Sequence, residues 1–276
     1  MFSFRRKRSR KQRFLDAARA APARGRELRK AAAQLDIPWA RSWFAGVIRE
    51  NFLRFVLNPT MDYYAARRAT GKEKLEGVKG PVILVANHAS HMDTPVILSA
   101  LPRKLRKRTV VAAAADYFYK NRLVASLVSL IFNTVPIERH GGGGGVSKNG
   151  SHLDKLLDQG WSVLLYPEGT RSRGGRQGPL RRGAAVLAAA HHLTIVPIRV
   201  TGTAQAMPPG RLWPRRLRDK PVPKRHRIEV SFGEPINANG DPTELMESVR
   251  GFFENGGAPT PYRSPYRSRE TVKSER

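Results

Sequence analysis

Residues 82–93 read VILVANHASHMD, and the other segments of the chain can be placed around this stretch. Residues 82–86 are an unbroken run of aliphatic and β-branched side chains, which is typical of a strand buried on both faces of a parallel sheet. The run ends at Asn87 and His88, and a short polar turn leads to Asp93, where a helix is expected to begin. We therefore predict that His88 lies at the carboxyl end of a buried strand, where open α/β sheets bind their ligands.

The spacing of His88 and Asp93 suits an acid–base pair. A step of five residues across a strand-to-helix turn can bring the carboxylate back to the imidazole. The carboxylate would accept the proton of one ring nitrogen and leave the other nitrogen as a base. Two other interpretations are open at this point: a structural histidine, and a metal site of His88, His91 and Asp93. These residues alone favour the structural histidine, then the acid–base dyad, then the metal.

The composition restricts the classes of function. A length of 276 residues suits one α/β domain with tails. Because the chain has no cysteine, a cysteine nucleophile and a thiolate zinc site are excluded. The net charge of +28 indicates a polyanionic partner, such as nucleic acid, anionic lipid headgroups or a phosphorylated substrate. No uncharged run reaches the roughly 18 residues of a membrane-spanning helix, and no signal-peptide core follows the basic start, so we expect a cytoplasmic protein.

Four segments are expected along the chain. Residues 1–37 form a basic, partly helical arm, and residues 38–62 form an amphipathic helix. Residues 63–254 form an α/β domain, because strand-like runs alternate with helical stretches. This pattern predicts a single mixed, largely parallel sheet flanked by helices. Residues 255–276 are polar and form a disordered tail.

The amphipathic segment admits two interpretations. Its apolar side chains fall at steps of three to five residues, which places them on one helical face. They are Trp39, Trp43, Phe44, Val47, Ile48, Phe52, Phe55 and Val56. Two tryptophans on such a face, with arginines around it, resemble an interfacial membrane helix. An ordinary helix that packs on the core explains the pattern equally well.

Two further strands end in clusters that contain arginine. Residues 134–137 are followed by Glu138 and Arg139. The buried run at residues 161–166 is followed by Pro167, Glu168, Gly169, Thr170 and Arg171. A guanidinium group matches the oxygen atoms of a phosphate. A base dyad and two arginines at strand ends therefore predict proton abstraction beside an anionic group.

Four sequence blocks together resemble the glycerolipid acyltransferase family, whose best-known member is 1-acylglycerol-3-phosphate acyltransferase. HASHMD at 88–93 matches the family's H-x-x-x-x-D motif, and VPIER at 135–139 resembles the second motif. YPEGTRS at 166–172 is very similar to the third motif, F-P-E-G-T-R-S, and IVPI at 195–198 resembles the fourth. The first motif alone is weak, but the four in order are specific. The resemblance covers roughly residues 75–235.

Two positions depart from the family pattern. Glu138 stands where many members have Asp, and Tyr166 stands where many have Phe. Neither departure touches the chemistry that the resemblance implies.

The resemblance implies a glycerol-phosphate acyltransferase-like fold and a reaction. A glycerol hydroxyl would attack an acyl thioester on coenzyme A (CoA) or acyl carrier protein (ACP), with His88 as the base and Asp93 fixing its tautomer. No metal and no cofactor beyond the acyl thioester co-substrate are implied. The residues that would hold the phosphorylated acceptor are Arg139, Glu168, Gly169, Thr170 and Arg171.

The expected partners are an acyl thioester donor, a lysophospholipid acceptor and an anionic membrane surface. The acceptor expected first is 1-acylglycerol 3-phosphate, which would give phosphatidic acid, and the expected location is peripheral, on the cytoplasmic face of the membrane. The alternatives are an acyltransferase for another lysolipid, a basic nucleic-acid-binding protein and a metallohydrolase. No specific nucleic acid is expected, because the basic residues are spread along the chain and match no recognised nucleic-acid motif.

Overall fold

The computed structural model describes six stretches of the chain. They are residues 35–115, 121–137, 152–172, 177–211, 213–217 and 224–255. The predictions for the basic arm up to residue 34, for Glu138 and Arg139 and for the tail from residue 256 lie outside these stretches.

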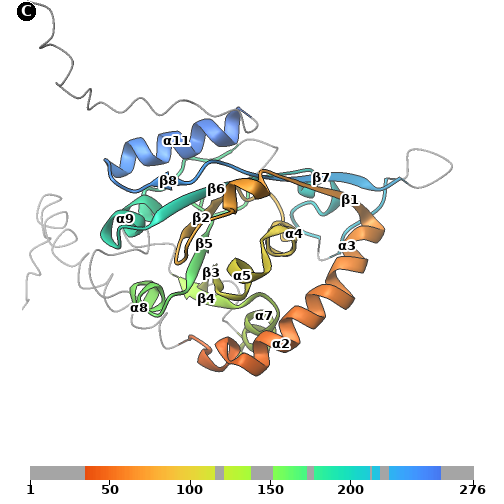
Figure 1. Ribbon diagram of the computed structural model, residues 1–276. Helices are drawn as coiled ribbons and strands as arrows, with labels where there is room; N and C mark the ends of the chain where they lie inside the picture. Colours follow the sequence, from red (N-terminus) through yellow and green to blue (C-terminus); the bar gives the residue numbers. More distant parts are fainter. Residues whose placement is uncertain are drawn as a thin grey trace, which may run out of the picture.

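The described residues form one eight-stranded sheet (Figure 1). Its strands are β1 (Ala65–Thr70), β2 (Ile83–Ala86), β3 (Thr109–Ala114), β4 (Thr134–Ile137), β5 (Ser162–Leu165), β6 (Thr194–Thr201), β7 (His226–Phe232) and β8 (Ile236–Asn237). The order is β1-β7-β6-β2-β5-β3-β4, and β8 pairs with β6. β7 and β8 run antiparallel to β6, whereas the other pairs are parallel. The predicted mixed, largely parallel sheet is confirmed.

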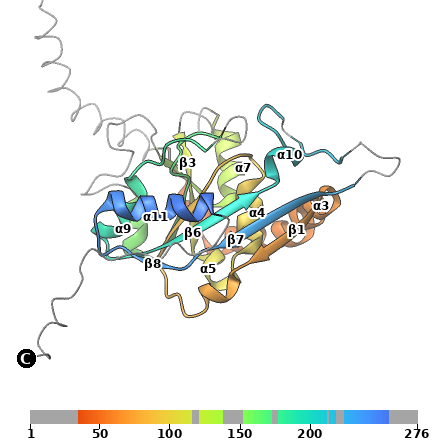
Figure 2. The ribbon, with the colours of Figure 1, turned by 90° about the horizontal axis from the view of Figure 1, so that it is seen from above.

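Helices cover both faces of the sheet. They are α2 (Trp43–Phe52), α3 (Asn58–Tyr64), α4 (Asp93–Ala100), α5 (Arg103–Lys107), α7 (Arg122–Phe132), α8 (His152–Asp158), α9 (Gly183–Ala190), α10 (Thr203–Ala206) and α11 (Pro242–Glu254). Shorter turns are η1 (Pro38–Arg41), the π-helical η2 (Leu53–Leu57) and η3 (Lys72–Leu75). α9 and α11 lie on one face, and α4 and α5 lie on the other (Figures 1 and 2).

The alternation of side chains along β2 divides the core into two layers. Ile83 and Val85 pack with α8, α9 and α11, whereas Leu84 and Ala86 pack with α4. All four side chains are fully buried. This explains why the central strand reads as a continuous apolar run, since both of its faces are covered. The residue that follows this strand therefore lies at one fixed edge of the sheet.

The sequence did not predict β1. Residues 65–70 read AARRAT, a stretch without the apolar run or the alternation that marks a strand. Within the described sheet they form an edge strand that pairs with β7, from Ala65 opposite His226 to Thr70 opposite Ser231. An edge strand carries only a weak apolar signal, because much of its surface faces solvent.

The N-terminal helical segment runs from Pro38 to Tyr64 as η1, α2, η2 and α3, two residues beyond the predicted boundary at 62. It passes beside α7 (Figure 1). Arg49 of α2 joins the two helices: its Nε donates to the Leu130 carbonyl of α7 at 2.9 Å. Burial lowers the pKa of the Arg49 guanidinium to about 10, so it stays charged at neutral pH.

The apolar face of this segment is exposed rather than packed on the core. Trp43 is 82% exposed and Phe44 is 66% exposed, while Ala45 on the inner side is buried. The core-packing interpretation is therefore wrong for these aromatic side chains. Among the described residues, no helix combines the length and the apolar character needed to cross a membrane.

Candidate active site

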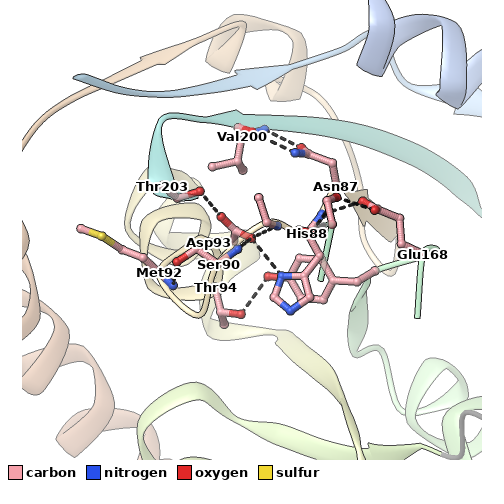
Figure 3. Close-up of polar contacts among 12 residues, drawn as sticks. Asn87, His88, Ser90, Met92, Asp93, Thr94, Glu168, Val200 and Thr203 are labelled. Carbon is pink, nitrogen blue, oxygen red and sulfur yellow. Dashed lines mark hydrogen bonds and ion pairs between the residues drawn. The ribbon is translucent and has the colours of Figure 1, made fainter. Parts of the chain in front are cut away.

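Asn87 fixes the point at which the chain leaves the sheet. Its Nδ2 donates to the Val200 carbonyl at 2.9 Å, and the Val200 N–H donates to its Oδ1 at 2.7 Å (Figure 3). The amide thereby extends the β2–β6 pairing by one position beyond Ala86, which is opposite Ile198. His88 follows directly, so its backbone begins from a fixed position.

The third sequence block holds the backbone of His88 from the other side. The His88 N–H donates to Glu168 Oε1 at 2.9 Å, and the Ser172 N–H donates to the His88 carbonyl at 2.7 Å. Glu168 Oε2 accepts from Ser172 Oγ at 2.6 Å and from the Gly178 N–H at 3.2 Å. Both oxygens of this buried carboxylate thus accept hydrogen bonds from the protein itself.

The structure brings His88 and Asp93 together, as their spacing predicts. His88 Nδ1 lies 2.9 Å from Asp93 Oδ2, and the same oxygen accepts from the N–H groups of Ala89 at 2.7 Å and Ser90 at 2.8 Å. Asp93 is fully buried in the first turn of α4, where the helix dipole favours a negative charge. Because an ionised carboxylate only accepts hydrogen bonds, Nδ1 carries the proton and Nε2 is left as a base.

Tyr166 supports the imidazole from one side. The two rings are stacked with centroids 4.2 Å apart, and the Tyr166 hydroxyl lies 2.8 Å from Thr94 Oγ1. Burial raises the pKa of the Tyr166 phenol, so it stays protonated at neutral pH. Within the described part of the chain, His88 Nε2 makes no hydrogen bond. The ring is therefore held on its Nδ1 side and by stacking, and its basic nitrogen is left for a substrate.

A cavity of about 510 Å³ opens beside the dyad. His88, His91, Thr94, Tyr166 and Gly169 line it together with a largely apolar wall. That wall comes mainly from β3, β4 and α7, through Val111, Ala112, Ala113, Ala114, Val124, Val128, Phe132 and Ile137. The arrangement suits a ligand with an alkyl chain and a reacting polar group near His88.

The predicted acceptor residues are only partly brought together. Gly169 lines the cavity with φ of 70°, in the left-handed region that favours glycine. A Cβ on Gly169 would lie 3.0 Å from Cζ of Arg181, so the glycine makes room for a second arginine that the sequence did not single out. Thr170 is exposed and Arg171 is half-buried on the same turn. Arg139 lies outside the described residues, and its role stays a prediction.

His91 lies on the cavity wall but is kept uncharged. Burial, and then the charges of Arg171 and His88, lower its pKa to about 4, while Asp93 acts in the opposite direction. His91 is therefore neutral at physiological pH. No group of three or more His, Cys, Asp or Glu side chains in the described stretches is placed to hold a metal ion.

The lowered pKa of His91 predicts a loss of stability in acid. The unfolded chain takes up this proton near pH 6.5, whereas the folded chain takes it up only near pH 4, so stability falls as the pH falls between these values. After allowance for partial exposure, wild type should lose on the order of 1 kcal/mol more than His91→Gln between about pH 7 and pH 4.5. Urea unfolding at the two pH values measures this difference. Parallel losses in the two proteins would contradict it.

Thr203 and Ser172 contact the catalytic loop, which is residues 87–93. The sequence did not single out either residue. Thr203 Oγ1 lies 2.5 Å from Asp93 Oδ1, although 110 positions separate the two residues. No local pattern signals such a contact. Ser172 stands within the third block, and its role in holding His88 becomes visible only when β2 and β5 are placed side by side.

Comparisons with known proteins agree with this geometry. Residues 66–201 match the family model described as Acyltransferase. This part of the chain, residues 66–201, belongs to the acyltransferase family. The family match contains the dyad, the third block and all of β6, so the resemblance of the four sequence blocks is confirmed.

Named relatives of the chain are similar over part of their length. The chain is 30% identical over 164 residues to the 1-acyl-sn-glycerol-3-phosphate acyltransferase of Limnanthes douglasii, covering 59% of this chain and 53% of that protein. It is 27% identical over 186 residues to the probable 1-acyl-sn-glycerol-3-phosphate acyltransferase of Mycoplasma genitalium, covering 64% of this chain and 66% of that protein. The chain spans about half or less of the length of several curated relatives that it matches.

A solved structure shares the fold of the chain. The crystal structure of PlsC, the 1-acyl-sn-glycerophosphate acyltransferase of Thermotoga maritima, matches with a TM-score of 0.52 and 20% identity. The match covers 75% of this chain and 80% of that one. The predicted glycerol-phosphate acyltransferase-like fold is confirmed.

Proposed function

We propose that this chain transfers a fatty acyl group from acyl-CoA or acyl-ACP to the free hydroxyl of 1-acylglycerol 3-phosphate, giving phosphatidic acid. The observation that carries the proposal is the His88–Asp93 dyad, which leaves Nε2 as a base beside a cavity with a largely apolar wall. The names of the relatives support the choice of acceptor.

In the proposed reaction His88 Nε2 takes the proton from the acceptor hydroxyl as its oxygen attacks the thioester carbonyl carbon. The tetrahedral intermediate then collapses, the carbon–sulfur bond breaks, and the proton on Nε2 passes to the departing sulfur. Asp93 stabilises the imidazolium that forms between the two steps. The acceptor supplies the nucleophilic oxygen, so the protein needs no nucleophile of its own.

The two parts of the cavity lining suit the two parts of the substrates. The wall of β3, β4 and α7 offers apolar surface for an alkyl chain. On the turn that carries Gly169 and Arg171, the glycine lines the same cavity, and the charge of Arg171 acts on His91 of the cavity wall. We assign the acceptor phosphate to this turn, because guanidinium groups bind phosphate oxygens in pairs.

An acceptor panel tests the proposal. Purified protein, oleoyl-CoA and a set of lysophospholipids are incubated, and the products are separated by mass. We expect 1-acylglycerol 3-phosphate to be acylated faster than lysophosphatidylcholine or lysophosphatidylethanolamine. A strong preference for another lysolipid would keep the chemistry and change the acceptor. The absence of any acylated product with every donor and acceptor would refute the proposed function.

We further propose that the protein is peripheral on the cytoplasmic face of an anionic membrane. The α2–α7 face, defined as Trp39, Trp43, Phe44, Leu123 and Leu127, supports this proposal. Each of these side chains is at least half exposed, and α2 contacts α7. Such a face suits the region just below lipid headgroups, and the net charge of +28 suits anionic lipid.

Replacing Trp39 and Trp43 together with serine should release the protein from vesicles. Both side chains are exposed, so the double variant should stay folded while losing apolar area that would enter the lipid. Sedimentation with anionic and neutral vesicles at two salt concentrations measures the binding. Trp213→Ser is the matched control, since Trp213 is 62% exposed beside Tyr64 at the other end of the helical segment. Unchanged vesicle binding by the folded double variant would contradict the proposal.

A further inference from the structure

Thr203 makes a contact that has no role in the reaction proposed above. It is the first residue of α10, directly after β6 (Figure 2), and its side chain is fully buried. Its hydroxyl donates to Asp93 Oδ1 at 2.5 Å (Figure 3). The direction of the bond is fixed, because an ionised carboxylate has no proton to donate.

The two oxygens of Asp93 have separate partners. Oδ2 faces His88 Nδ1 and the N–H groups of Ala89 and Ser90. Among the residues that the structure describes, Thr203 is the donor that Oδ1 accepts from. Asp93 is fully buried, so water does not reach it to replace a lost donor. The hydrogen bonds to the two oxygens therefore fix the rotation of the carboxylate about its Cβ–Cγ bond.

The segment that carries Thr203 is itself held against the catalytic loop. The turn into α10 uses Gly202 at φ of 85°, where a Cβ would lie 1.9 Å from the Arg227 carbonyl oxygen of β7. Four residues after Thr203, the Met207 carbonyl accepts from Ser90 Oγ at 2.7 Å. Three residues before it, Val200 exchanges two hydrogen bonds with Asn87. Residues 200–207 thus contact the loop at three points, and Thr203 is the one that touches the dyad.

We propose that Thr203 is a positioning residue for acyl transfer, whose hydroxyl holds the Asp93 carboxylate so that Oδ2 stays directed at His88 Nδ1. This inference rests on the proposed function. Thr203 keeps its proton throughout the reaction, and only His88 Nε2 gains and loses one. When Nε2 takes up the acceptor proton, the imidazolium charge is opposed by a carboxylate that is already oriented. The cost of reorienting Asp93 during the reaction is thereby avoided.

The first test separates the hydroxyl from the bulk of the side chain. Thr203→Val keeps the branched shape without the hydroxyl, whereas Thr203→Ser keeps the hydroxyl. We expect Thr203→Val to lower kcat roughly ten- to hundredfold, the worth of one hydrogen bond to a charged group. The KM values for acyl-CoA and acceptor should stay within about twofold, because Thr203 does not line the cavity. Thr203→Ser should restore most of kcat. Should Thr203→Val fail to fold, Thr203→Ala carries the same comparison.

Thr109→Val is the matched control. Thr109 is also buried, and its hydroxyl donates to the Leu105 carbonyl at 2.8 Å at the start of β3. The cavity wall uses the later residues of this strand. Thr109→Val should therefore lose stability as Thr203→Val does while keeping kcat. A similar loss of kcat in both valine variants would show a general effect of packing and overturn the proposal.

A spectroscopic measurement tests the same contact without turnover. The proton that His88 Nδ1 donates to Asp93 is expected to give a downfield resonance in ¹H NMR of the histidine-¹⁵N-labelled protein. We expect Thr203→Val to shift or broaden this resonance, and Thr203→Ser and Thr109→Val to leave it in place. An unmoved resonance in folded Thr203→Val, or equal loss of kcat in Thr203→Val and Thr203→Ser, would overturn the proposal. If wild type transferred no acyl group, the proposed function would fail, and the resonance would still report whether Thr203 orients Asp93.

Discussion

His88→Ala is expected to lower kcat by about two to four powers of ten, the usual contribution of a positioned general base. The side chain lines the cavity and its Nδ1 is held by Asp93, so alanine removes the only proton acceptor assigned to the acceptor hydroxyl. Asp93→Asn should cause a loss of similar order, because an amide can donate to Nδ1 and favour the wrong tautomer. Release of the CoA thiol measures both rates.

The two variants need different controls. His192→Asn is a matched control for His88→Ala: His192 is exposed just before β6 begins, at the other end of that strand from the site, and asparagine tolerates its φ of 52°. Asp93→Asn also removes an acceptor from the four donors around it, so its thermal stability must be compared with that of wild type. A folded His88→Ala protein that kept most of its turnover would refute the assignment.

Arg171→Ala is expected to act on the acceptor and not on the donor. A hydrogen bond to a charged group contributes about 1.5–3 kcal/mol, which corresponds to a rise of roughly ten- to hundredfold in the KM for a phosphorylated acceptor. The KM for acyl-CoA should stay near the wild-type value. Arg171→Lys should recover little, because an ammonium group cannot bind two phosphate oxygens as a guanidinium does. Steady-state kinetics with each substrate varied in turn gives the two constants.

A neighbouring arginine controls for the loss of surface charge. Arg182 is exposed at the start of α9, and its guanidinium faces Thr243 of α11 instead of the cavity. Arg182→Ala should leave both KM values near wild type. If Arg171→Ala raised the two KM values equally, or raised neither, the phosphate would have to be assigned elsewhere.

The sequence predicted those parts of the site that depend on neighbouring residues. The strand at residues 83–86 and the dyad of His88 and Asp93 are encoded within a dozen positions, by an apolar run, a polar turn and the start of a helix. The sheet class followed from the alternation of such runs with helices. The edge strand at residues 65–70 was missed, since its sequence AARRAT shows no alternation of apolar and polar residues.

The remaining features depend on pairings that bring distant segments together. Glu168 was predicted to bind substrate, yet both of its oxygens accept hydrogen bonds from His88, Ser172 and Gly178. An anionic acceptor would be repelled by this carboxylate, so we interpret Glu168 as a support for the His88 backbone. Direct contact with substrate stays a prediction. Thr203 could not be found from the sequence, because it reaches Asp93 only through the pairing of β2 with β6.

The most direct test is a measurement of CoA release and phosphatidic acid formation in the same reaction. Purified protein is mixed with oleoyl-CoA, first alone and then with 1-acylglycerol 3-phosphate. The proposed mechanism predicts that CoA appears one for one with phosphatidic acid, only after the acceptor is added, and that His88→Ala nearly abolishes both. Equal CoA release without acceptor, or phosphatidic acid formed at the wild-type rate by folded His88→Ala, would contradict it.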